Sequence, residues 1–112
     1  MKIEKEMQEQ IQELQISEQA MQNLLMQKQA FQIELNEVSS TIEELEKTKD
    51  EVYKISGQVM LKSNKEDLKK ELEEKKKLLE LRLKSIEKQE SSISEKVGSL
   101  RHKIEDFLSA KK

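Results

Sequence analysis

The sequence contains no cysteine, proline or tryptophan, and it has only two glycines and three other aromatic residues among its 112 positions. The absence of cysteine excludes disulfides and thiolate metal sites. With so few aromatic residues, the chain has few large apolar side chains from which to build a globular core. The absence of proline allows long uninterrupted helices. The sequence also lacks an apolar run long enough for a signal peptide or a membrane span. We therefore expect a cytoplasmic protein with no membrane partner.

Charged residues make up 39% of the chain and hydrophobic residues 34%, with a formal net charge of −2. A composition this rich in Glu, Lys, Gln and Leu is typical of long helices or coiled coils. The near-neutral charge gives no attraction to nucleic acid for the chain as a whole. The length predicts a single domain over residues 1–112. Disorder is the rival for so polar a chain, but a disordered segment would not show the apolar periodicity described next.

A heptad pattern of apolar residues runs through the first part of the chain. The steps alternate between four and three residues, and most of the positions are apolar. This pattern predicts a helix over about residues 2–50 with one buried seam. The seam positions are Ile3, Met7, Gln10, Leu14, Ser17, Met21, Leu24, Lys28, Phe31, Leu35, Val38, Ile42 and Leu45.

The stretch that follows has β-branched and aromatic residues around a central Gly57, which predicts a β-hairpin over about residues 52–62. Ser56-Gly57-Gln58 supplies the turn, because glycine adopts positive φ without steric cost. Each strand would carry one apolar pair on a single face. An isolated hairpin is marginally stable in water, and the chain offers no further strand. We therefore expect strands of other subunits to complete the sheet, with these pairs as the assembly residues: Tyr53 and Ile55, Val59 and Leu61.

A second helix is predicted over about residues 64–110, capped either by Ser63 with Glu66 or by Asn64 with Asp67. Its seam mirrors the first seam about Gly57, so that every matched pair joins an a position to a d position. That relation is the one an antiparallel coiled coil requires. The predicted fold class is mainly α: a long antiparallel two-helix coiled coil with one β-hairpin at the connecting end. The second seam is Leu72, Lys76, Leu79, Leu83, Ile86, Glu90, Ile93, Val97, Leu100, Ile104 and Phe107.

Apolar residues spread beyond the seam at the end of the helices that carries the two chain termini. Ile11 and Leu108 occupy e positions that the opposite helix does not fully cover, and apolar surface left uncovered is an interaction surface. The same residues could instead be ordinary coiled-coil core, and the sequence leaves both interpretations open. The candidate set at this end is Ile3, Met7, Ile11, Ile104, Phe107 and Leu108; further off-seam apolar residues are Leu25, Met26 and Ile33.

No pattern in the sequence predicts catalysis, a metal or a cofactor. His102 is the only histidine and has no cysteine to share a metal with. Carboxylates such as Glu43 and Glu44 belong to a helix surface without a pocket to hold a substrate. The lysines between Lys65 and Lys77 are interleaved with acidic residues, so we interpret them as a solvated helix face and not as a phosphate-binding patch.

The chain resembles the β-type subunits of prefoldin over essentially its full length. The resemblance is strongest in three runs: Val52-Tyr53-Lys54-Ile55-Ser56-Gly57, Leu61-Lys62-Ser63-Asn64-Lys65-Glu66, and Leu81 to Glu90. One hairpin between the helices is similar to the β-type, because the α-type carries two.

This resemblance implies a hexamer of two α-type and four β-type subunits on a β-barrel platform. It also implies an ATP-independent chaperone that binds unfolded polypeptides at the helix tips and passes them to a group II chaperonin. Two other classes stay open: an adaptor coiled coil that binds no clients, and a helical hairpin that contacts nucleic acid, which the acidic balance disfavours.

Overall fold

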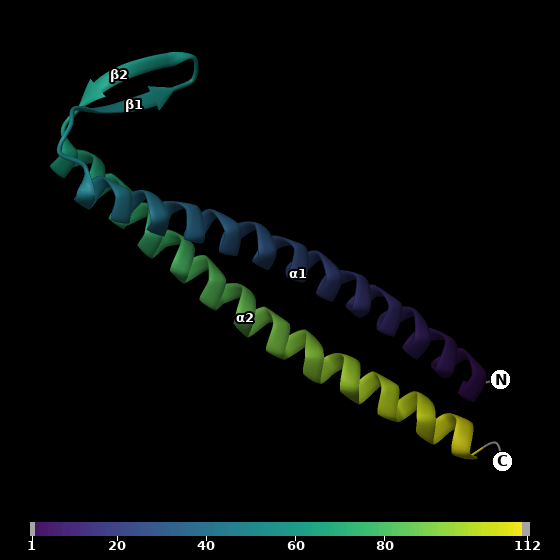
Figure 1. Ribbon diagram of the computed structural model, residues 1–112. Coiled ribbons are helices and arrows are strands. Elements are labelled where there is room, and N and C mark those ends of the chain that lie inside the picture. The colour runs from purple at the N-terminus through teal and green to yellow at the C-terminus, as the bar shows by residue number, and fades with distance from the viewer. Residues whose placement is uncertain (1, 111–112) are drawn as a thin grey trace. The chain divides into compact units, whose positions relative to one another are not determined.

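The computed structural model describes residues 2–110, with side chains from residue 4 onward. The chain forms a helix α1 (Lys2–Lys47), strands β1 (Val52–Ser56) and β2 (Val59–Ser63), and a helix α2 (Lys65–Ala110) (Figure 1). This order confirms the predicted class of two long helices joined through one β-hairpin.

The structure divides into two compact units. The terminal unit comprises residues Met1–Lys28 and Lys84–Lys112, and the hairpin unit comprises residues Gln29–Leu83. In each unit a segment of α1 packs antiparallel to a segment of α2.

The heptad seam is the buried side of both helices. Every seam residue whose side chain is described is buried or half-buried. In the terminal unit the buried seam residues are Ser17, Leu24, Ile86 and Leu100; in the hairpin unit they are Val38, Ile42, Leu45, Leu79 and Leu83. The side chains that are buried therefore recur along each helix with the heptad spacing that the sequence predicted.

The core of the hairpin unit is built across the seam from both helices. Val38 and Ile42 of α1 pack with Leu79 of α2, which is 4% exposed. Phe31, Leu35 and Leu72 pack against this cluster, and the Arg82 guanidinium lies 5.6 Å from the centre of the Phe31 ring. These contacts follow the mirror relation about Gly57 and confirm the antiparallel pairing.

The hairpin closes through a two-residue turn at Gly57 and Gln58, one residue tighter than the predicted turn. Gly57 has φ of 62°, and no other described residue has positive φ. Glycine at the first central position with positive φ is typical of a type II′ turn, whose twist suits a hairpin. The turn pairs Ser56 with Val59 and thereby sets the register of the whole ladder.

The joint between helices and hairpin is held by side chains that bind backbone groups. α1 ends at Lys47, three residues before the expected end, and the Lys65 ammonium donates to the carbonyl oxygens of Glu46 (3.1 Å) and Thr48 (3.0 Å) at this end. α2 begins at Lys65, since the Asn64 side chain accepts a hydrogen bond of 2.8 Å from the Glu66 amide. Of the two caps that the sequence allowed, Asn64 is the one used, while Ser63 closes β2.

Candidate functional site

The hairpin exposes apolar side chains on both of its faces. In an antiparallel ladder, residues directly opposite each other point to the same side of the sheet. Ile55 lies opposite Met60, and Tyr53 lies opposite Lys62, so Tyr53, Ile55 and Met60 share one face. The other face carries Val52, Val59 and Leu61 together with Lys54.

The predicted assembly residues thus form two groups on opposite sides of the sheet. Each pair shares one face of its own strand, as the sequence indicated. The two-residue turn places the pair on β1 and the pair on β2 back to back. All four side chains are at least half exposed, up to 71% for Ile55.

Met60 is equally exposed and was missed by the sequence analysis. Its position on the Ile55 face follows only from the register, which the tighter turn determines.

Ion pairs tether the hairpin to its surroundings. Lys54 Nζ lies 3.0 Å from both carboxylate oxygens of Glu71 on α2, and Lys62 Nζ lies 3.1 Å from Glu51 Oε1. The Tyr53 hydroxyl donates to Glu51 Oε2 at 2.9 Å. The ammonium of Lys62, with the Tyr53 hydroxyl second, lowers the pKa of the Glu51 carboxyl below its usual 4.5.

A shallow hollow lies at the base of the hairpin, where the strands meet the helix ends. The first residues of β1 line it from one side, and the end of α1 and the start of α2 line it from the other. Apolar side chains form much of its wall, continuous with the exposed hairpin surface. Its lining residues are Thr41, Glu44, Leu45, Thr48, Val52, Tyr53, Lys54, Leu68 and Leu72.

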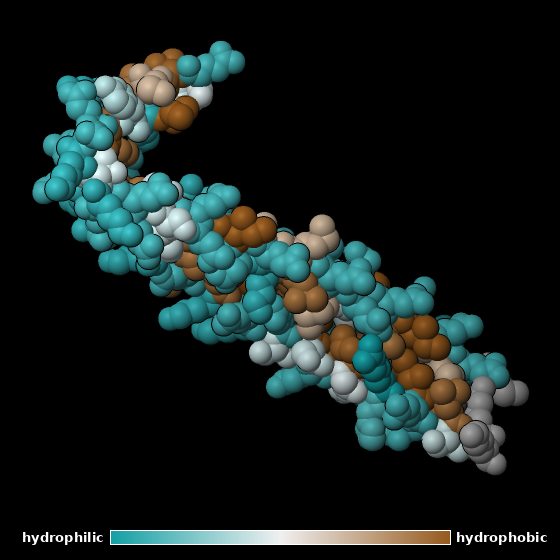
Figure 2. Space-filling view, in the orientation of Figure 1, coloured by the Kyte–Doolittle hydropathy of each residue, from teal (hydrophilic) through white to brown (hydrophobic). Residues whose placement is uncertain are grey.

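The terminal unit carries the second apolar surface. Met7, Ile104 and Phe107 are half-buried in the seam, as coiled-coil core residues are, while Ile11 and Leu108 are 37% and 51% exposed. Ile3 lies in α1, but its side chain falls outside the described part. Figure 2 shows hydrophobic side chains gathered on the helix pair near the chain ends and, separately, on the hairpin.

The seam of the terminal unit contains polar residues, which reduce the apolar surface that the seam buries. Gln10 Oε1 is buried without a hydrogen-bond partner among the described residues. A buried acceptor left unpaired costs about 1–3 kcal/mol. The Gln10 layer therefore stabilises the terminal unit less than a fully apolar layer would.

Apolar residues also lie on the outer surface of the helices, away from the seam. The off-seam residues noted in the sequence, Leu25, Met26 and Ile33, are all exposed. Ile16, Leu78 and Leu81 are exposed as well and were not singled out. The heptad assignment could have found them, because they occupy c and f positions opposite the seam.

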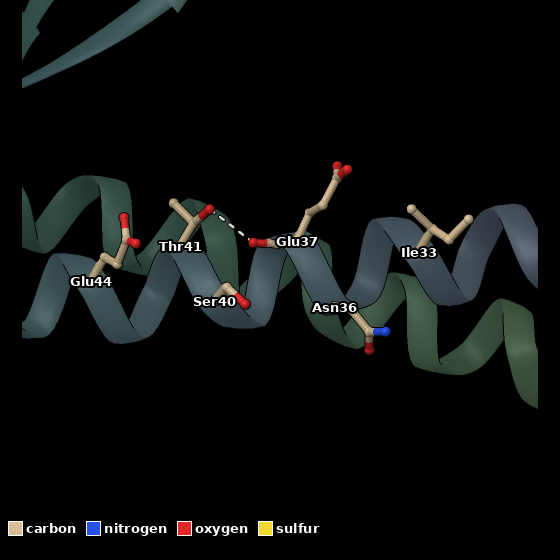
Figure 3. Close-up of a pocket in the computed structure, with 6 residues that line it drawn as sticks. All are labelled: Ile33, Asn36, Glu37, Ser40, Thr41 and Glu44. Atoms are coloured by element: carbon tan, nitrogen blue, oxygen red, sulfur yellow. Dashed lines mark hydrogen bonds between the residues drawn. The ribbon is translucent and has the colours of Figure 1, made fainter.

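A further hollow lies beside Ile33. All six of its lining residues, from Ile33 to Glu44, come from the outer side of α1 alone (Figure 3). The Thr41 hydroxyl donates to the Glu37 carbonyl of its own helix at 2.8 Å, so it does not act as a free polar group there.

Over residues 2–110 no group of three His, Asp or Glu side chains is placed to hold a metal ion. In the same range neither helix has a stretch apolar enough to cross a membrane.

Comparison with known proteins decides the family. The chain matches the sequence profile of the prefoldin subunit family over residues 3–110. It belongs to the prefoldin subunit family. The crystal structure of the prefoldin beta subunit from Thermococcus strain KS-1 is 33% identical and superposes with a TM-score of 0.84, covering 90% of each chain. No curated protein sequence matches the chain.

Membership in the prefoldin family gives the coarse function. The chain is a chaperone-type subunit of a family whose members are not enzymes, and it assembles with other subunits into a prefoldin complex.

Proposed function

We propose that this chain is a β-type subunit of an ATP-independent chaperone that binds non-native polypeptides at the terminal unit and delivers them to a group II chaperonin. The observation that carries the proposal is the exposure of Ile11 and Leu108, at e positions beside the half-buried Met7, Ile104 and Phe107. Ile3 completes the set by its place in the heptad.

Client capture at this surface is apolar and weak for each arm. Burying one aliphatic side chain contributes about 1.5–3 kcal/mol, and the proposed client surface of one terminal unit offers two beyond the seam, Ile11 and Leu108. Several arms on one platform then act multivalently, so the complex binds far more tightly than one arm does. Because each contact is weak, a client can transfer to a second binder without nucleotide hydrolysis.

Assembly into that platform is assigned to the hairpin. The hairpin is a two-stranded sheet whose outer edges are unpaired among residues 2–110. Its exposed apolar residues are Tyr53, Ile55, Val59 and Leu61, now joined by Met60. Strands of neighbouring subunits would satisfy these edges and cover the faces. We propose a cytoplasmic hexamer of two α-type and four β-type subunits in which this chain acts as one domain.

A second candidate function is an adaptor coiled coil that assembles through the hairpin and binds no client. The outer-surface residues Ile16, Leu78 and Leu81 favour it, because apolar surface away from the ends can bind a folded partner.

An aggregation assay separates the two candidates. The complex, co-expressed with an α-type partner, is mixed with a chemically denatured client that is then diluted into buffer. If the complex is a chaperone, the light scattering of the client should rise more slowly as more complex is added, without ATP. Client aggregation at the rate of buffer alone would contradict it and leave the adaptor.

A further inference from the structure

Ion pairs join α1 to α2 in both units, and in four of them the acidic residue is on α1 and the basic residue on α2. In the terminal unit Glu13 pairs with Lys96 (3.0 Å) and Glu18 with Arg101 (3.6 Å). In the hairpin unit α1 again supplies the acid and α2 the base, and the pairs there are Glu34–Lys75 (3.1 Å) and Glu46–Lys69 (3.0 Å). A parallel pair of α1 helices would bring Glu13 against Glu18 on the flanks of the terminal unit. A parallel pair of α2 helices would bring Lys96 against Arg101 there, so both pairings would join like charges in that unit.

One further pair lies in the seam itself and has the reverse sense. Lys28 of α1 and Glu90 of α2 occupy seam positions in neighbouring layers, with Nζ 3.2 Å from Oε1 and 3.4 Å from Oε2. Both residues are half-buried, while the seam residues Leu24 and Ile86 are buried. Glu90 Oε1 is shielded from solvent and lacks a properly oriented hydrogen-bond donor among the described residues, so the Lys28 ammonium compensates its charge.

Such a pair discriminates between alternative pairings of the helices. Both residues are at a positions, which in a parallel pairing of two copies would place Lys28 against Lys28 and Glu90 against Glu90. A slip of one heptad that sets Lys28 opposite Leu79 would place the two charges about 16 Å apart along the axis, against about 6 Å in register. It would leave the Lys28 ammonium against an apolar side chain without its counter-charge. A slip in the opposite direction keeps the two residues in neighbouring layers, so the pair does not discriminate against it. The flanking pairs alone do not prevent the first slip as strongly, because they are exposed and weak.

We infer that the Lys28–Glu90 pair, set in the seam with its charges reversed relative to the flanking pairs, selects the in-register antiparallel pairing of α1 with α2 in the terminal unit. It does so over parallel pairings and over the one-heptad slip that sets Lys28 opposite Leu79. The pair thereby aligns the chain ends that carry Ile11 and Leu108. Its contribution is to uniqueness of pairing, which polar seam residues are known to supply at a cost in stability.

The test measures register directly with spin labels. The chain has no cysteine, so Gln12→Cys and Lys88→Cys introduce the only two labelling sites, both at exposed positions of the terminal unit. These sites are about two heptads apart along the axis, so a slip of one heptad changes their distance by up to about 10 Å. Double electron–electron resonance is recorded on the full chain diluted tenfold with unlabelled chain.

Three variants in this labelled background give the outcomes. Lys28→Leu with Glu90→Leu should add a second distance, shifted by up to about 10 Å, or broaden the distribution to that extent. The exchange Lys28→Glu with Glu90→Lys should restore the one distance of the parent chain. The matched control, Glu13→Gln with Lys96→Gln, removes an exposed flanking pair and should keep that one distance. The inference is overturned if the double-leucine variant keeps the single distance of the parent chain. It is also overturned if the exchange variant shows more than one distance, or if the distance distribution of the control broadens as much as that of the double-leucine variant.

Discussion

At the scale of single residues, the two glycines have opposite roles. Gly98 lies inside α2, and a Cβ added there would meet no atom within 4 Å. Gly98→Ala should therefore stabilise the chain by about 1 kcal/mol through helix propensity, raising Tm by a few degrees. Gly57→Ala is the matched contrast, because the φ of 62° costs an L-residue about 1–2 kcal/mol. Thermal unfolding followed by circular dichroism measures both, and a lower Tm for Gly98→Ala would refute the propensity argument.

A second residue-scale prediction concerns the Glu51 carboxyl. Lys62 and Tyr53 lower its pKa, so its favourable pairing is present above the usual pKa of 4.5 and is lost as pH falls through the lowered value. Lys62→Gln should raise the Glu51 pKa towards 4.5, since it removes the larger cause. An NMR titration of the Glu51 side-chain carboxyl carbon checks this. An unchanged pKa in Lys62→Gln would show that another group is responsible.

At the scale of elements, the joint at the hairpin depends on Lys65. Its ammonium binds two carbonyl oxygens at the end of α1, where the helix dipole also favours a cation. Lys65→Met keeps the aliphatic stem and removes both hydrogen bonds, which should cost about 1 kcal/mol in the free energy of unfolding. Urea denaturation compares it with Lys70→Met, a fully surface lysine of the same helix. Equal midpoints for the two variants would argue against the clamp.

The two apolar faces of the hairpin can be tested one at a time. Ile55 belongs to the Tyr53 and Met60 face, and Val59 belongs to the Leu61 face. If neighbouring subunits cover both, then Ile55→Asp and Val59→Asp should each bury an unpaired charge and yield smaller species in size-exclusion chromatography. Gln58→Asp, in the turn and outside the ladder, is the control. Should only one variant dissociate, assembly uses that face alone; unchanged elution of both would exclude a hairpin-built platform.

At the scale of the whole molecule, client binding and assembly should separate. Ile11→Ser with Leu108→Ser removes exposed apolar surface but leaves the seam intact, so the mass of the complex should not change. Each substitution loses about 1–2 kcal/mol of contact, or about 2–4 kcal/mol together, so at least about thirtyfold more complex should be needed for equal protection of a client. Ile16→Ser, which removes an exposed isoleucine from the outer surface of the same helix, is the matched control. Loss of the oligomer would instead place Ile11 and Leu108 in assembly.

The buried sides of the helices and their antiparallel pairing were predictable because both follow from the local periodicity of apolar residues. The alternating steps of three and four determine which side of each helix is buried, and the mirror relation about Gly57 determines that the chain pairs with itself antiparallel. Both follow from helix geometry and need no knowledge of distant contacts. The candidate residues at the chain ends, Ile11 and Leu108, were likewise indicated by their heptad positions.

Tertiary structure decided what periodicity leaves free. The turn at Gly57 and Gln58 set the strand register, which placed Val59 and Leu61 on the face opposite Ile55 and brought Met60 beside it. Lys65 binds the last carbonyl oxygens of α1 across the joint, although its neighbours in the sequence suggested a solvated lysine. Lys28 and Glu90, matched to Ile86 and Leu24 by the seam, reach each other instead because long side chains span neighbouring layers. Local sequence thus determined which surfaces are apolar, while backbone register and side-chain reach decided which groups meet.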